Sequence, residues 1–572
     1  METRRLLLAA LLSMVVLLLW QKFFPPPEPV VTPAIEELAA LPTELPPAAT
    51  AAVVTPPPAE GVEEGGEATE GSTGELPIEG ASSREVVLEN ERVRAVWSNR
   101  GAQLTSFELK RHPNGGGGTV DLVRRRQSGS YPFGLVDAEG AELELNGKLF
   151  AVNRHQGGAL FSYRGSAGSA NKRVTLRPDG LMEVTVEAAG SWRLVLGPGL
   201  RNPGPEEAKS RFASRAAIYR QAGDVERVSP DRTKEAQVIS ATALDWVGLQ
   251  DQYFLVAALP VAGLREAVIE PVLFDLDDAG LATFIARPAE LSAAEEGLGE
   301  ELRVLLTPEA GKLEINTYFG SKQLDQLAAL PASLEEAVEL GIFGFLAKPL
   351  LIALRWIHSN MVGNYGWAII LLTIALRIVL FPLNHKSIAS MQKMQSINPK
   401  MQAIRAKYRP KLKDKKGRPN ADASAKMNQE IMALYKSEGV NPAAGCLPMV
   451  LQMPVLFAFY RLLSTTVELR QAPWMGWIHD LSVKDPYYIL PLVMGASMIL
   501  QQKMTPAQGD PMQRRMMMMM PVVFTFLFLG FPAGMVLYWL TNNILAIAQQ
   551  MGYKRWRPAP ETAVAERGGK KK

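Results

Sequence analysis

The feature that most constrains the fold of this chain is one arginine, Arg377, inside the otherwise apolar segment Tyr365–Leu383. An isolated guanidinium in a membrane-spanning helix is costly unless the protein supplies water or polar partners. If Gly363–Leu383 is the span, a rise of ~1.5 Å per residue places Arg377 about 21 Å from one end and about 9 Å from the other. A snorkelling arginine usually lies closer to the edge. A hydrated polar cavity is therefore the favoured interpretation, and snorkelling stays open as the simpler one.

The composition divides the chain into two compartments. At 572 residues it is too long for one ordinary domain, and its apolar residues gather in a short N-terminal stretch and after about residue 340. Cys446 is the only cysteine, which rules out an intramolecular disulfide and a cysteine-based metal cage. The histidines do not form a zinc-binding spacing such as His-Glu-x-x-His. We therefore predict neither a metal nor another cofactor.

The N-terminal stretch Leu6–Trp20 is rich in leucine and follows Arg4 and Arg5. It resembles a signal sequence, but no small-x-small cleavage site comes after it. Residues 1–24 are thus predicted to be an uncleaved transmembrane anchor with its arginines in the cytoplasm. Residues 25–81 are rich in Pro, Ala and Glu and cannot bury enough apolar surface to order themselves, so we expect a disordered tether.

Residues 82–325 are predicted to form an exported β-sandwich. Apolar residues alternate in short runs, as in Val184 and Val186, and Gly, Asn, Pro and Asp separate the runs. Short strands without long amphipathic helices between them indicate packing of sheet on sheet. Three aromatic residues, Trp246, Tyr253 and Phe254, could line a binding cleft. Aromatic residues in a strand-rich domain more often belong to the core, which is the interpretation we favour.

The last part of the chain is predicted to be a membrane region. Residues 326–362 are predicted to form a linker and an interfacial amphipathic helix. Lys348 and Arg355 are spaced along the apolar run Leu340–Ile357, as expected of a helix that lies among lipid headgroups. Residues 363–383 are predicted as transmembrane helix 2 and residues 446–550 as helices 3 to 6. The hydrophobic segments behind that prediction are Cys446–Leu463, Tyr487–Gln502, Met516–Gly530 and Ala533–Gln550. Several are shorter than the ~20 residues normally needed, which indicates local thinning or support from neighbouring helices.

The distribution of basic residues tests this topology independently. Six spans that start from a cytoplasmic N-terminus must end in the cytoplasm. The predicted inner loop Asn384–Gly445 carries thirteen Lys or Arg against four Asp or Glu, and Arg514 and Arg515 occupy the next inner loop. A basic tail, residues 551–572, follows the last span. The chain is therefore predicted to be a multi-pass protein of the bacterial inner membrane, with both termini cytoplasmic and residues 25 to about 340 periplasmic.

The long inner loop, residues 384–445, is predicted to form a helical hairpin. Apolar residues follow helical spacing on both arms, for example Met394 and Met401 on the first and Ile431 and Tyr435 on the second. The basic run Lys411–Arg418 marks the tip. Such a run is usually only a solvated turn, and contact with anionic lipid is the alternative.

Several motifs together resemble one family. They are Asn441–Tyr460, Val467–Trp474, Trp477–Leu481, Asp485–Pro491 and Phe531–Gly534. In these motifs the chain is similar to the YidC family of bacterial membrane protein insertases, over about Leu340–Arg557. The anchor, tether and β-rich domain resemble the Gram-negative branch, with weaker motif support around Trp246–Phe254. The fold class that follows is an α-helical membrane protein with six transmembrane helices, five of them forming the insertase core, and a large exported β-sandwich domain.

The resemblance implies an insertase or chaperone that takes hydrophobic segments of nascent proteins through a hydrophilic groove. It would release them sideways into the inner membrane without enzymatic chemistry or a cofactor. The residues that match groove or client-contact positions are Arg377, Thr373, Gln452, Tyr538, Trp539 and Asn542. At Trp539 some relatives have tyrosine, so this chain keeps the stacking area and lacks the hydroxyl.

The expected partners follow from the same resemblance. They are nascent membrane proteins, membrane lipids, the ribosome through the basic cytoplasmic regions, and the Sec translocon; no specific nucleic-acid sequence is expected. Two other functions remain open from the residues alone. A secondary transporter could use an intramembrane charge, although the sequence lacks an internal repeat of the span pattern. A membrane-anchored periplasmic carbohydrate-active enzyme is suggested only by the sandwich class, and fold alone does not assign an activity.

Overall fold

The computed structural model describes residues 77–114, 117–201, 215–230, 233–276, 282–286, 299–412, 420–439, 447–504 and 511–556. The predicted anchor, residues 1–24, lies outside the described residues. So do almost all of the predicted tether and most of the predicted basic tail. The described residues all fall within one compact unit, Glu75–Lys572.

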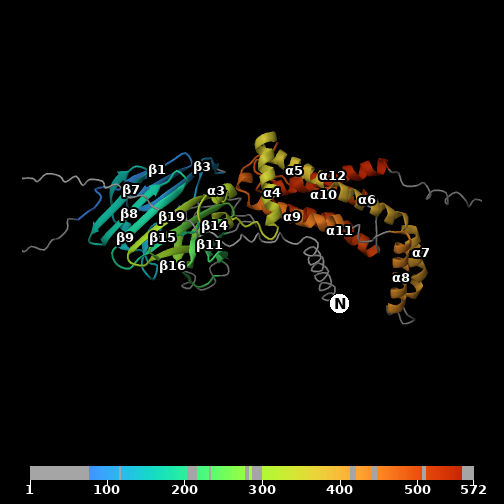
Figure 1. Cartoon of the computed structure of the whole chain (residues 1–572), viewed down its shortest axis with the longest axis horizontal. Helices are drawn as coiled ribbons and strands as arrows, with labels where there is room; N and C mark the ends of the chain where they lie inside the picture. The colour runs from blue at the N-terminus through green and yellow to red at the C-terminus, as the bar shows by residue number, and fades with distance from the viewer. Residues whose placement is uncertain are drawn as a thin grey trace, which may run out of the picture. The chain divides into compact units, whose positions relative to one another are not determined.

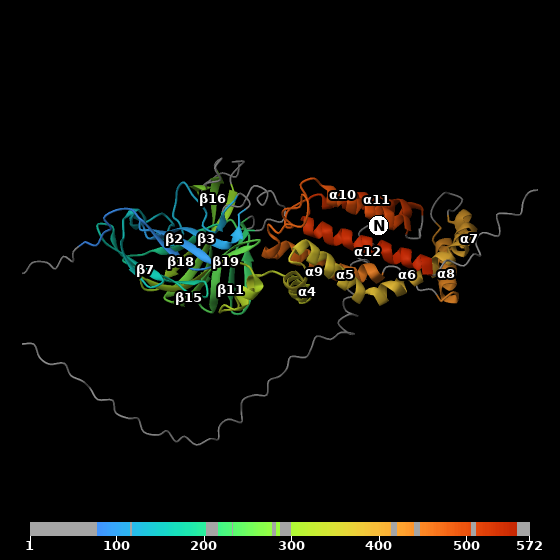
Figure 2. The same ribbon diagram turned by 90° about the horizontal axis from the view of Figure 1, so that it is seen from above.

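Three antiparallel sheets make up the β-rich part of the chain (Figures 1 and 2). The four-stranded sheet has the order β1 (Glu85–Glu89), β2 (Val93–Ser98), β3 (Gln103–Pro113) and β4 (Thr119–Asp121). The six-stranded sheet has the order β13 (Gln237–Ser240), β16 (Leu264–Leu276), β18 (Gly299–Pro308), β10 (Arg193–Pro198) and β5 (Leu135–Val136), with β17 (Ala282–Ala286) paired to β16. The nine-stranded sheet has the order β12 (Asp224–Val228), β11 (Arg215–Gln221), β14 (Leu244–Asp251), β15 (Phe254–Ala262), β19 (Lys312–Ser321), β9 (Leu181–Ala188), β8 (Gly168–Leu176), β7 (Gly158–Gly165) and β6 (Ala151–His155).

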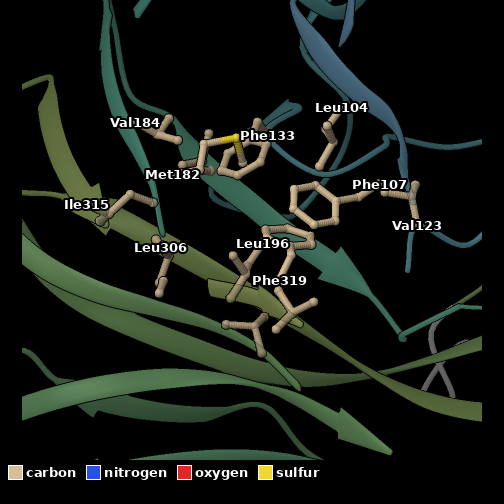
Figure 3. Packing of buried hydrophobic residues seen from close by; sticks show 14 of the residues in the cluster. Leu104, Phe107, Val123, Phe133, Met182, Val184, Leu196, Leu306, Ile315 and Phe319 are labelled. Carbon is tan, nitrogen blue, oxygen red and sulfur yellow. The ribbon is translucent and has the colours of Figure 1, made fainter. Parts of the chain in front are cut away.

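One hydrophobic cluster draws residues from all three sheets, as expected when sheets pack face to face. Figure 3 shows its centre, where Phe107 and Phe319 approach each other with ring centroids 5.0 Å apart. Nearby, Trp97 is fully buried and stacks on Phe133 at 5.0 Å. The alternation seen in the sequence therefore corresponds to side chains that point inward from each strand.

The aromatic residues considered for a cleft belong to the core. Trp246 and Phe254 are 0 % exposed and Tyr253 is 4 % exposed. The Trp246 indole N–H donates to the carbonyl of Ala332 at 3.0 Å, so its polar group is satisfied inside the fold. The core interpretation is correct, and these side chains do not line an open cleft.

A short helical segment joins the strands to the longer helices. It contains α3 (Leu324–Ala328), η4 (Leu334–Ala337), α4 (Gly344–Ile357) and the π-helical turn η5 (His358–Val362). One side of α4 is buried, whereas Phe345, Ile352 and Trp356 are exposed. The exposed side therefore carries apolar side chains as well as Lys348, and the interfacial location of this helix stays a prediction.

The chain turns sharply between α4 and α5 (Tyr365–Val379). Gly363 adopts a left-handed conformation with φ of 59°, which a residue without Cβ adopts at little cost. Asn364 then caps α5, because its side-chain oxygen accepts a hydrogen bond from the backbone N–H of Trp367. The two helical stretches consequently meet at a bend of 116°.

The remaining helices are α6 (Phe381–Ser396), α7 (Asn398–Tyr408), α8 (Ala421–Ser437), α9 (Leu447–Thr465), α10 (Ile489–Met504), α11 (Pro511–Phe528) and α12 (Ala533–Trp556). Short 3-10 turns are η1 (Glu144–Gly147), η6 (Arg409–Lys411) and η8 (Val467–Leu469). Helix α12 packs against both α10 and α5, as Figure 2 shows, and α4 packs against α9. A second hydrophobic cluster fills the space among these helices, with Met494, Phe459 and Tyr538 among its most buried members.

Helix α5 is shorter than the predicted span 363–383. It ends at Val379, Leu380 forms a turn, and α6 begins at Phe381. Pro382 provides a physical reason, because proline lacks a backbone N–H and therefore fits best in the first turn of a helix, which is its position in α6. Arg377 consequently lies in the last turn of α5, closer to the end of its helix than predicted.

Within the described residues, none of the helices taken singly has both the length and the apolar composition of a membrane span. The bent pair Gly344–Val362 and Tyr365–Val379 meets both criteria when taken together, and Met518–Phe528 is a shorter apolar helix.

Helices α7 and α8 lie side by side. The Tyr435 hydroxyl donates to the sulfur of Met401 at 3.1 Å, and Lys407 pairs with Glu430 at 2.9 Å. Asn420 caps α8 by accepting from the N–H of Ala423. Residues 413–419, which include most of the basic tip, lie outside the described residues.

Candidate functional site

Arg377 is half-buried and donates two hydrogen bonds to one residue of α12. Its Nε donates to the side-chain oxygen of Asn542 at 2.8 Å, and its Nη2 donates to the backbone carbonyl of the same residue at 2.9 Å. Hydrogen bonds from a charged donor are stronger than those between neutral groups. The position in the last turn of α5 adds a favourable interaction with the helix dipole.

The partner of Arg377 is a neutral amide and not a carboxylate. The ion pairs found within the described ranges do not involve Arg377. Asn542 satisfies two of the N–H groups, and the guanidinium has further N–H groups to offer. The positive charge is therefore held in place without being neutralised.

A second polar contact lies one turn earlier on α12. The Tyr538 side chain is 1 % exposed, and its hydroxyl accepts a hydrogen bond from Nε2 of Gln452 on α9 at 2.7 Å. The Tyr538 ring stacks on Phe459 with centroids 4.2 Å apart. Polar groups from α5, α12 and α9 thus gather in one region of the helical bundle.

Two of the six predicted site residues, Thr373 and Trp539, are not among the partners in the hydrogen bonds described above. Thr373 is 1 % exposed, and its hydroxyl donates to the carbonyl of Ile369 in its own helix at 2.7 Å. Trp539 packs against α11, with its ring 5.9 Å from Phe524 and 5.2 Å from Phe528. Successive residues of a helix point about 100° apart, which separates Trp539 from its neighbour Tyr538.

The sequence analysis did not single out Asn543 and Ser497. The Asn543 amide is 6 % exposed and donates to the hydroxyl of Ser497 on α10 at 3.1 Å. A signal was present in the sequence, since Thr541, Asn542 and Asn543 are consecutive polar residues inside an apolar helix, where such residues are costly.

An open hollow of about 580 Å³ lies along α4, lined by Phe345, Lys348, Pro349, Ile352, Ala353 and Trp356. Arg377, Asn542, Tyr538 and Gln452 do not line this hollow. Among the described residues, no three His, Cys, Asp or Glu side chains are grouped as metal ligands. The chemistry available around Arg377 is accordingly attraction and hydrogen bonding by a fixed cation.

Comparison with known proteins divides the chain near the end of α4. The family profile for "YidC periplasmic domain" matches residues 85–353, and the profile for "60Kd inner membrane protein" matches residues 356–559. The first match covers the strands and most of the linking segment. The second covers most of the helical part, including all six predicted site residues.

Curated relatives match over most of the length of both chains. A protein of Geobacter metallireducens named "Membrane protein insertase YidC" is 36 % identical over 491 residues, which cover 82 % of this chain and 85 % of that protein. A protein of the same name from Geobacter sulfurreducens is 38 % identical over 475 residues, which cover 79 % and 83 %. A solved structure named "Active YidC insertase crystal structure with the first transmembrane domain resolved" is 16 % identical with a TM-score of 0.34, and the match covers 82 % of this chain and 93 % of that one.

Proposed function

The chain belongs to the YidC family of membrane protein insertases, and from this premise we propose that it inserts hydrophobic segments of nascent proteins by way of a hydrophilic groove containing Arg377. It is an insertase of the bacterial inner membrane with a β-rich periplasmic domain, and it is not an enzyme. Membership of this family argues against both alternatives from the sequence, a carbohydrate-active enzyme and a secondary transporter.

The observation that carries the groove proposal is the half-buried guanidinium held by a neutral amide. Polar groups that cross bare hydrocarbon lose their hydrogen bonds with water, and each costs several kcal/mol. A hydrated groove that reaches part of the way through the bilayer shortens this path. A cation with unused N–H groups attracts acidic residues of a translocating tail, more strongly in a site of low dielectric than in water.

We propose that the chain crosses the membrane six times, with five spans forming the insertase core and both termini in the cytoplasm. The hydrophobic segments and the positive charge of the predicted inner loops support this topology. Helix α12, with 24 residues, is about 36 Å long, whereas α10, with 16 residues, is about 24 Å long. Since the hydrocarbon core is about 30 Å thick, the shorter helices imply local thinning of the bilayer around the groove.

The hydrophobic client segment leaves the groove sideways in this proposal. Apolar side chains on the outer surfaces of α9 and α11, such as Phe457 and Phe526, are exposed and suited to contact with client segments or lipid. Partition of the client segment into hydrocarbon then drives its release. The basic cytoplasmic loops are suited to anionic lipid and to the ribosome, and cooperation with the Sec translocon is part of the same proposal.

Insertion assays with paired clients test the role of Arg377. Two client proteins with the same hydrophobic segment, one with an acidic and one with an uncharged translocated tail, are inserted into vesicles that contain the wild type or Arg377→Ala. Loss of a charged hydrogen bond is worth ~1.5–3 kcal/mol, so we expect the acidic client to lose about tenfold or more in insertion rate and the uncharged client much less.

Arg377→Lys is the matched control for this experiment. Lysine keeps the charge but loses the forked geometry, so its insertion of the acidic client should fall between that of the wild type and that of Arg377→Ala. Equal effects of Arg377→Ala on both clients would contradict the proposal.

A further inference from the structure

Two consecutive asparagines of α12 contact different helices. Asn542 accepts from Arg377 on α5, and Asn543 donates to Ser497 on α10. Because neighbouring residues on a helix point about 100° apart, one short stretch of α12 reaches both partners at once. Through α12, the Arg377 guanidinium on α5 is thereby linked to α10.

The hydrogen-bond roles at Ser497 are fully determined. Its hydroxyl donates its single proton to the carbonyl of Met494 at 2.6 Å, so the oxygen can only accept from the Asn543 amide. Arg377 likewise can only donate, which fixes the side-chain oxygen of Asn542 towards it. Both asparagine amides are therefore held in a defined orientation by their partners.

This contact is partly buried, because Ser497 is half-buried and its other neighbours are more enclosed. Met494 is 0 % exposed, Leu540 is 8 % exposed, and Asn543 itself is 6 % exposed. A hydrogen bond in such a region is stronger than one in water, and an unmade one is costly. Rotation of α12 about its own axis would break the bond to Ser497 and, at the same time, move both oxygens of Asn542 away from Arg377.

We propose that Asn543 and Ser497 form a positioning contact for the insertase. They fix the rotation of α12, so that Asn542 presents its side-chain and backbone oxygens to Arg377 and the remaining guanidinium N–H groups stay directed to the client. This inference rests on the proposed function of Arg377. Asn542 then acts on the client through Arg377 rather than by touching it.

The test compares client selectivity and not total activity. Asn543→Leu keeps the approximate size of the side chain and removes the hydrogen bond. We expect it to slow insertion of the acidic-tailed client about tenfold while the uncharged client changes less than twofold, as a tenfold change corresponds to about 1.4 kcal/mol. Ser497→Ala breaks the same contact with a smaller change and should shift selectivity in the same direction, which keeps the test available if Asn543→Leu does not fold.

A reciprocal exchange provides the rescue. The double variant Ser497→Asn with Asn543→Ser places an amide opposite a hydroxyl again. It should recover at least half of the insertion rate that the acidic-tailed client loses, relative to the uncharged client, in Asn543→Leu. Thr525→Val is the matched control, because it removes a bundle hydroxyl that donates to the carbonyl of Pro521 in its own helix. We expect this control to leave the ratio between the two clients unchanged.

The outcomes separate this inference from the function on which it rests. If Arg377→Ala is selective and Asn543→Leu slows both clients equally, Asn543 is only a structural contact and the inference is overturned. Failure of the exchanged pair to restore selectivity overturns it as well. If Arg377→Ala itself shows no selectivity, the proposed function fails first. When Arg377→Ala is combined with Asn543→Leu, the insertion rate of the acidic-tailed client relative to the uncharged client should be no lower than in Arg377→Ala alone.

Discussion

At the scale of single residues, Lys172 is the most unusual group of the β-rich domain. Its side chain is buried, and its Nζ donates to the carbonyls of Gly101 and Phe133, each at 2.6 Å. Phe133 has a φ of 67°, a conformation that non-glycine residues rarely adopt. The lysine therefore satisfies carbonyls in two turns, one of which holds Phe133 in this unfavourable conformation. Lys172 lies on the inward face of β8, and the sequence alone could not reveal this, because its acceptors lie 71 and 39 positions away.

Lys172 should make stability depend on pH. Burial lowers the pKa of Lys172 to about 7, whereas in the unfolded chain the pKa is about 10.4. Between these values the unfolded state binds more protons, so the free energy of unfolding rises with pH, with a slope of up to about 1.4 kcal/mol per pH unit. This contribution is lost as the pH falls from about 10 towards 7.

Chemical unfolding of the full-length protein at pH 7, 8 and 9 measures this effect. Lys172→Met removes the titrating group. The free energy of unfolding of the wild type minus that of the variant should therefore increase with pH. Parallel pH profiles for the two proteins would show that Lys172 does not titrate in this range.

At the scale of elements, α5 begins in a tight contact with the loop between α9 and α10. A Cβ added to Gly366 would lie 2.2 Å from the Trp474 ring, and the amide of Asn364 donates to the carbonyls of Pro473 and Trp474. The sequence predicted an apolar helix here. It could not show that the helix start and the loop pack directly, because such contacts depend on tertiary structure.

Gly366→Ala should therefore destabilise the protein although alanine is the better helix former. The ring of Trp474 must move, and overpacking of this kind costs ~1–3 kcal/mol. Gly552→Ala in α12 is the matched control, since a Cβ there meets no atom within 4 Å. Thermal unfolding should show a lower Tm for Gly366→Ala and an unchanged or higher Tm for Gly552→Ala. A Gly366→Ala variant as stable as the control would mean that the Trp474 contact is not tight.

At the scale of the whole molecule, the motifs identified the family and the six candidate residues, but not how those residues meet. Tyr538 and Trp539 are neighbours in the sequence, yet Tyr538 contacts α9 and Trp539 contacts α11. The rotation of each helix, which is set by packing against its neighbours, decides which candidates come together. A motif records the residue type and its spacing, and it does not record that rotation.

The most direct test of a water-filled groove is the reactivity of neighbouring thiols on α9. Cys446 is the only cysteine, so Cys446→Ser gives a cysteine-free background. Into this background we would introduce Gln452→Cys, at the half-buried position that contacts Tyr538, or Met453→Cys, at the adjacent apolar position that is 40 % exposed. Each is treated in vesicles with a membrane-impermeant maleimide from the cytoplasmic side. Maleimides react with thiolate, which forms in water and not in hydrocarbon. The account predicts rapid labelling at position 452 and little at position 453; labelling at 452 as slow as at 453 would contradict it.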